Sequence, residues 1–210
     1  LTAGLRTGTQ KYSFDSKHNT GQVKLDLGYS RNWDATLATE IKIIDNQTIA
    51  GFRKSIGWAK DQRVFFYSRF SRPFKQWKIQ QDGQQFKSKQ AQGKNIVALF
   101  DFELSDNSVV EVTTAISSVS SENARLNFVE EGENKSFATV KQQAREEWSK
   151  VLDPIQIDAS EDNKTQFYTA LYHSHLAPRV FSDANGQYKG ADGETHKVTG
   201  HRRFSFFSLW

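Results

Sequence analysis

The sequence predicts a mainly β protein, a sandwich or a barrel, that becomes helical in its last third. Short runs of alternating apolar and polar residues dominate from Lys11 to about Phe128. Turn residues separate these runs at frequent intervals. At about residue 133 the apolar period changes from two residues to three or four. Many short strands joined by frequent turns are typical of sandwiches and barrels.

The strand candidates each have one face suited to burial. Val23, Leu25 and Leu27 alternate with Lys24 and Asp26, as in a strand with one buried face. The other candidates are Ile41 to Ile44, Arg63 to Phe70, Phe74 to Ile79, Asn95 to Leu104 and Val109 to Ile116. Turn signals between them are Asp82-Gly83, Gly93-Lys94 and Ser105-Asp106-Asn107.

Two helices are predicted after the strands. Ser136 can cap a helix that ends at Asp153-Pro154, and its apolar side consists of Phe137, Val140, Ala144, Trp148 and Val151. A second helix begins at Ser160 and stops at Pro178, because proline ends helices and the acidic Glu161 and Asp162 suit a helix N-terminus. A Gly- and Asp-rich loop and an apolar terminus, residues 204–210, follow.

Composition narrows the function classes. The net charge is +4, but Lys and Arg are dispersed among almost as many Asp and Glu, so we expect no nucleic-acid partner. Absence of Cys excludes disulfides and cysteine catalysis. The sequence has no run of about 18 apolar residues, so no membrane span is expected, and no signal peptide is recognisable at its start. The start at Leu1 and the lack of Met suggest a piece of a longer chain, although processing or modified methionines would also explain them.

Several motifs together resemble one enzyme family. The stretch from Phe167 to Ser174, the residues Phe181-Ser182-Asp183 and the ending from Arg203 to Trp210 resemble the opening of the catalytic domain in glycoside hydrolase family 92. Further matches to that family's sandwich domain are Arg6-Thr-Gly8, Gly57-Trp58, Phe70-Ser71 with Pro73-Phe74, and Ser117 to Glu122.

This resemblance implies a two-domain enzyme with a β-sandwich, a helical linker and an (α/α)6 barrel. We expect residues 1–132 to form the sandwich without its front part, residues 133–157 the linker, and residues 158–210 the beginning of the barrel. Family members are bacterial exo-α-mannosidases that invert anomeric configuration with help from calcium, often at α-1,2 links of N-glycans or mannans. They are periplasmic, surface-anchored or secreted.

The family's catalytic carboxylates and most of its calcium ligands lie beyond the position of Trp210, so the resemblance assigns no catalytic or metal-binding residue here and implies an inactive fragment. The implied partners are a mannose-containing glycan and the rest of the catalytic domain. The resemblance offers four candidate substrate-binding residues: Trp210, Arg203, His201 and Ser208. An indole suits the C–H face of a pyranose, while simple packing is the competing interpretation for Trp210 and a structural loop role for the other three.

Other features favour structural interpretations. His173 and His175 flank Ser174 on different faces of a helix, unlike a helical zinc pair. The loop from Asp183 to Glu194 has the length of an EF-hand loop, but Tyr188 replaces the Gly at its sixth position. Trp148 is expected to pack the first helix onto its neighbours.

The alternative function is a non-catalytic carbohydrate-binding sandwich. Its aromatic platform would draw on Trp33, Trp58 and Trp77 with Phe65, Phe66 and Tyr67, although alternation places about half of strand side chains in a core. Residues 160–210 have no evident role in such a module.

Overall fold

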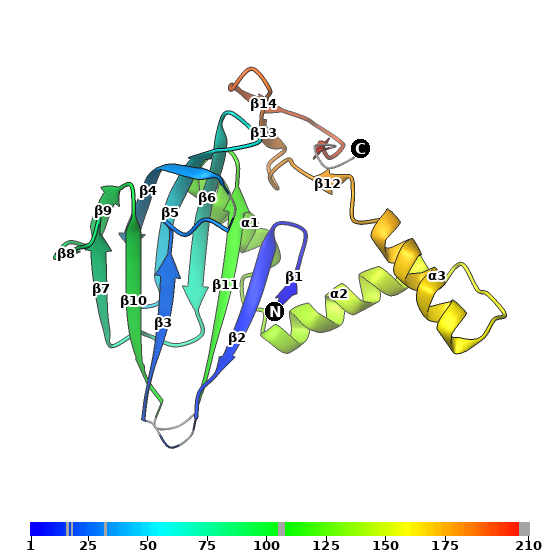
Figure 1. The fold of residues 1–210 in the computed structure, drawn as a ribbon, viewed down its shortest axis with the longest axis horizontal. Coiled ribbons are helices and arrows are strands. Elements are labelled where there is room, and N and C mark those ends of the chain that lie inside the picture. Colours follow the sequence, from blue (N-terminus) through cyan, green and yellow to red (C-terminus); the bar gives the residue numbers. More distant parts are fainter. Residues whose placement is uncertain (16, 18, 32, 105–107, 206–210) are drawn as a thin grey trace.

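The computed structural model describes residues 1–15, 17, 19–31, 33–104 and 108–205, so the predicted turn Ser105-Asp106-Asn107 lies outside it. Two antiparallel sheets pack face to face (Figure 1). The larger sheet has, in spatial order, β1 (Thr2–Ala3), β2 (Thr7–Ser13), β11 (Val109–Ser117), β6 (Gln62–Phe70), β5 (Thr48–Ile56), β4 (Ala35–Ile43) and β9 (Gln90–Gly93). The smaller has β3 (Thr20–Asp26), β10 (Ile96–Glu103), β7 (Gln76–Gln81) and β8 (Gln84–Phe86). The mainly β prediction is confirmed.

The core between the sheets is aromatic at its centre. Phe100 on β10 is fully buried, and its ring centroid lies 5.2 Å from that of Phe70 and 5.1 Å from that of Phe74. Ile41 and Ile79 extend the core on opposite sheets, and neither is exposed. The predicted alternation therefore directs one face of each sheet inward.

The outer face of the larger sheet is covered by a helix that the sequence did not reveal. α1 (Ser121–Glu131) contacts β11 and β6, and the ring centroids of Phe128 and Tyr67 lie 5.2 Å apart. Ser120 caps this helix by accepting a hydrogen bond from the Asn123 amide. The strand pattern thus ends at Ser117, not at about Phe128. α1 escaped notice because two of its four buried residues are asparagines, which hide the apolar period.

The two predicted helices are present with the predicted caps. α2 (Phe137–Leu152) starts after Ser136, and α3 (Glu161–Ser174) starts after Ser160. Trp148 packs α2 onto α3, with its ring centroid 4.6 Å from that of Tyr172. Val140 is the buried residue of α2, and no side chain of α3 is fully buried. The pair projects from the sandwich as an arm (Figure 1).

The remaining chain, residues 178–205, returns to the sandwich and is called the return segment below. It contains β12 (Arg179–Val180), which pairs with β15 (Phe204–Ser205), and the hairpin of β13 (Gln187–Lys189) and β14 (Thr195–Lys197). Figure 1 shows it near the end of the sandwich where β6 begins and β11 ends. The sequence identified this stretch as a loop rich in turns.

Candidate functional site

A buried carboxylate joins the return segment to the sandwich. Asp183 is 4% exposed and accepts three hydrogen bonds: from Ser117 Oγ at 2.7 Å, Asn123 Nδ2 at 2.8 Å and Asn127 Nδ2 at 2.8 Å. Asn127 also accepts a hydrogen bond from the Ala184 amide at 2.7 Å. We call these four side chains the Asp183 clasp. Burying a carboxylate is costly unless hydrogen-bond donors surround it. The three donors of the sandwich and α1 supply these partners when the return segment lies against them.

The Asp183 clasp also determines whether the EF-hand-like loop, Asp183 to Glu194, can bind calcium. Asp183 turns its carboxylate onto β11 and α1, where N–H and O–H donors occupy it, and Tyr188 lies in strand β13. Asp192 instead bonds His196 Nε2 at 2.8 Å, and this hydrogen bond is the main cause that lowers the pKa of Asp192. Over the described ranges, no group of three acidic, His or Cys side chains could hold a metal ion. The loop does not fit calcium.

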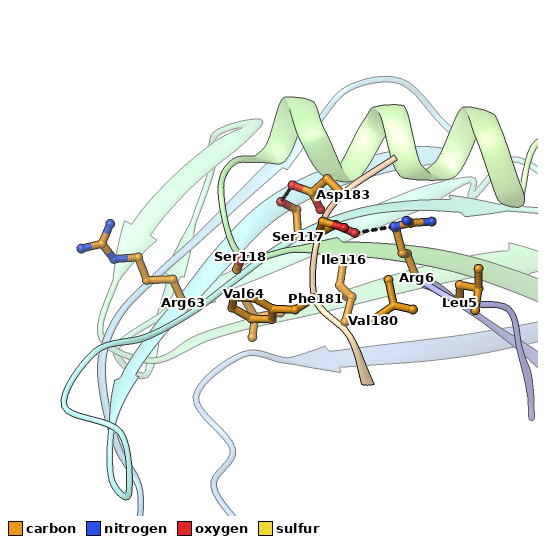
Figure 2. Close-up of a pocket in the computed structure, with 11 residues that line it drawn as sticks. Leu5, Arg6, Arg63, Val64, Ile116, Ser117, Ser118, Val180, Phe181 and Asp183 are labelled. Atoms are coloured by element: carbon orange, nitrogen blue, oxygen red, sulfur yellow. Dashed lines mark hydrogen bonds between the residues drawn. The ribbon is translucent and has the colours of Figure 1, made fainter. Parts of the chain in front are cut away.

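Arg6 makes a second attachment. Its Nε donates to the Ser182 carbonyl at 2.8 Å, the hydrogen bond drawn as a dashed line at Arg6 in Figure 2. The guanidinium and the backbone amide of Arg6 both contact the carboxylate of Glu131 on α1. The side chains of Arg6 and Glu131 are only 12% and 13% exposed. Arg6 therefore connects β2, α1 and the return segment.

Charged side chains make a third attachment at the hairpin. Lys189 Nζ lies 2.6 Å from Asp61 Oδ2 and donates to the Asp61 carbonyl at 2.9 Å. Arg63 Nε donates to Asp61 Oδ1 at 2.9 Å. The hydrogen bonds from Arg63, first, and Lys189 lower the pKa of Asp61 from 3.8 to about 2.

This third attachment predicts an acid-resistant contact. A lowered folded-state pKa gives stability that is complete above the unfolded value of 3.8 and is lost as pH falls through about 2. We expect the Asp61 carboxyl ¹³C resonance to titrate near pH 2. In Lys189→Ala the midpoint should rise but stay below 3.8, because Arg63 remains. A midpoint at 3.8 in the unaltered chain would show that neither cation holds Asp61.

Two adjoining hollows lie between the return segment and the sandwich. The inner hollow, about 170 Å³, is largely apolar, with Val64, Ile116 and Phe181 in its wall (Figure 2). The outer one, about 680 Å³, is an open groove that we call the end groove. Its volume is within the range of about 300–1,000 Å³ typical of ligand sites. Its polar lining includes Arg31, Asp34, Arg53, Gln62 and Lys189.

Ser118 marks the wall that the two hollows share. Its Oγ is buried and has no hydrogen-bond partner among the residues described. Buried hydroxyls are normally satisfied, so a bound water or ligand group is the expected partner of this one.

Of the four candidate residues from the sequence, His201 and Arg203 are described, and neither lines the two hollows. The exposed His201 bonds the Thr199 carbonyl through Nδ1 at 3.1 Å. The Arg203 guanidinium lies 5.7 Å from the Tyr188 ring centroid, and its carbonyl accepts from the Phe181 amide at 2.8 Å. Arg203 thus supports the fold of the return segment. Ser208 and Trp210 lie outside the described residues.

The hydrogen bonds of Ser117, Asn123 and Asn127 to Asp183 were not predicted from the sequence. Asn123 and Asn127 are four residues apart on one helix face, and both are buried. That spacing of amides, preceding an acidic loop, was the available signal.

Two family models divide the chain between them. The glycosyl hydrolase family 92 N-terminal domain matches residues 1–117, and the family's catalytic domain matches residues 123–210. The chain belongs to glycoside hydrolase family 92. The return segment that the Asp183 clasp holds is therefore catalytic-domain sequence of family 92, while the donor Ser117 belongs to its N-terminal domain.

Solved family 92 structures show the same fold. The alpha-mannosidase BT3965 from Bacteroides thetaiotaomicron is 28% identical, with a TM-score of 0.90 over 96% of this chain. Its complex with mannoimidazole gives 29% identity and a TM-score of 0.92 over 99% of this chain. The inverting mannosidase BT2199 from the same organism, at 22% identity and a TM-score of 0.81 over 95% of this chain, shares the fold. The chain spans 27–28% of the length of these proteins. No curated protein matches it.

Proposed function

We propose that the chain is the sandwich and the first catalytic-domain segment of an exo-acting, inverting α-mannosidase. The observation that carries this proposal is the match to BT3965, an alpha-mannosidase that has been solved with mannoimidazole. Mannosides of N-glycans or mannans, mainly α-1,2-linked, are the proposed substrates. Because such glycans are extracellular, we propose a periplasmic, surface or secreted location. No helix in the described ranges is long and apolar enough to cross a membrane.

The chemistry of inversion explains why this chain alone is proposed to be inactive. One carboxylic acid protonates the leaving oxygen and one carboxylate activates water, with roughly 6.5–9.5 Å between them. A general acid needs a raised pKa. Hydrogen bonds from Arg63 and Lys189 lower the pKa of Asp61, which lines the end groove, to about 2, so Asp61 is not proposed as that acid. The acid, the base and the calcium ligands are proposed to lie outside residues 1–210.

The test measures mannose release from α-1,2-mannobiose by the full-length protein, with and without EDTA, beside the 210-residue chain. We expect calcium-dependent release by the full-length protein and none by the chain. Release that persists in EDTA and is unaffected by added calcium would remove the metal from the proposal. No release by either protein, with glycan binding by the chain, would favour the non-catalytic sandwich module.

A further inference from the structure

Two exposed tryptophans lie together in the loops beside the end groove. Trp33, between β3 and β4, is 67% exposed, and Trp58, between β5 and β6, is 65% exposed. Their ring centroids lie 6.2 Å apart and their planes are tilted by 50°. Trp77, by contrast, packs against the core. Scattered exposed apolar residues are ordinary, but two large rings side by side at a groove indicate a binding surface.

The loop that presents Trp33 is held by hydrogen bonds within itself and to β5, and it packs closely against the loop that presents Trp58. An added Cβ on Gly57, which precedes Trp58, would lie 1.7 Å from Asp34 Oδ1, so a larger residue there would displace the Asp34 carboxylate. The Asp34 carbonyl accepts a hydrogen bond from Ser30 Oγ at 2.8 Å. Arg53 on β5 donates to the Tyr29 carbonyl. A pair that is positioned before binding loses less entropy when a ligand arrives.

The surroundings of the pair fit a neutral sugar. A pyranose presents an apolar C–H face and a rim of hydroxyl groups, so it needs an aromatic surface with hydrogen-bonding side chains beside it. Asp34 and Ala59, the chain neighbours of the two indoles, line the end groove, and Arg31, Arg53 and Gln62 supply donors and acceptors there.

We propose that Trp33 and Trp58 form a platform for a mannose unit of the glycan other than the one that is released. This inference rests on the proposed function. The end groove runs from these loops to Phe181 and Lys189 of the catalytic-domain segment, so it is continuous with the part of the chain that leads into the catalytic domain. The occupant is a neutral mannose oligosaccharide with at least two units.

The test compares a long and a short substrate in the full-length enzyme. Trp33→Ala and Trp58→Ala should each raise KM for α-1,2-mannotriose about three- to tenfold, the equivalent of about 0.5–1.5 kcal/mol per aromatic contact. The kcat values, and KM for p-nitrophenyl α-mannoside, should not change. Trp58→Phe should restore part of the affinity, because it keeps a ring. Phe86→Ala is the matched control, since Phe86 is 40% exposed on β8 of the other sheet.

Three outcomes are distinguishable. Unchanged KM for mannotriose in both alanine variants of an active enzyme would overturn the platform and leave the proposed function intact. Loss of thermal stability with unchanged KM would show that further sequence of the enzyme covers the pair, which also overturns it. If the unaltered protein releases no mannose, titration of its tryptophan fluorescence with mannotriose decides: weaker binding by both variants supports a sugar platform, and no binding by the unaltered protein overturns both proposals.

Discussion

Asp183→Ala is expected to lower the free energy of unfolding of the chain by about 3–5 kcal/mol. The substitution leaves the side chains of Ser117, Asn123 and Asn127 with buried donors that have lost their acceptor, and each such donor costs about 1–3 kcal/mol. Because all three donors lie in the sandwich and α1, the return segment should lose its attachment first. Urea unfolding followed by circular dichroism measures the loss.

Two further variants sharpen this test. Asp183→Asn keeps the shape but turns an NH2 group toward the amide donors, so we expect an intermediate loss. Asp158→Ala, at an exposed position before α3, should change the free energy of unfolding by less than about 0.5 kcal/mol. A loss below about 1 kcal/mol in Asp183→Ala would mean that water reaches the carboxylate and that the clasp is not closed in solution.

Phe100→Ala is expected to cost about 3–5 kcal/mol, as large-to-small changes of fully buried aromatics do. Phe100 lies on β10 of the smaller sheet, and its ring contacts Phe70 of the larger sheet and Phe74 in the connection between β6 and β7. Its removal opens a cavity between the sheets that neither rigid sheet can close. Thermal unfolding followed by calorimetry is the measurement.

The matched control for the core is again an aromatic residue. Phe86→Ala removes the same ring from the exposed strand β8, and we expect a small change, within about 0.5 kcal/mol. Phe100→Leu should cost less than Phe100→Ala because it leaves a smaller cavity. Equal effects of Phe100→Ala and Phe86→Ala would contradict the packing of the two sheets around Phe100.

Local patterns predicted the alternating strands and the two helices in which a capping serine precedes an apolar period of three or four residues. The pattern from Val109 to Ile116 alternates, and β11 covers it; Ser136 and Ser160 are capping residues, and α2 and α3 start directly after them. β5 was missed because residues 48–51 are buried in succession, under α1 on one face and in the core on the other. Alternation is lost when both faces of a strand are covered.

The site was harder to predict than the fold because its contacts are distant in sequence. Asp183 was noted in the family motif Phe181-Ser182-Asp183 and as the first position of an EF-hand-like loop, but its hydrogen-bond partners precede it by 56 to 66 residues. Pairing over such distances follows from the packing of α1 on β11, which no local pattern encodes. Trp33 and Trp58 were recognised as candidates for a platform on a sheet face, whereas the structure places them in loops.

The order of the clasp residues along the chain has a consequence for biosynthesis. Ser117, Asn123 and Asn127 leave the ribosome before Asp183 does, so the receiving surface is synthesised before the residue that binds to it. Domains fold as units during synthesis, the N-terminal one first. The folded sandwich with α1 therefore offers the Asp183 binding site to the catalytic-domain sequence as that sequence is synthesised.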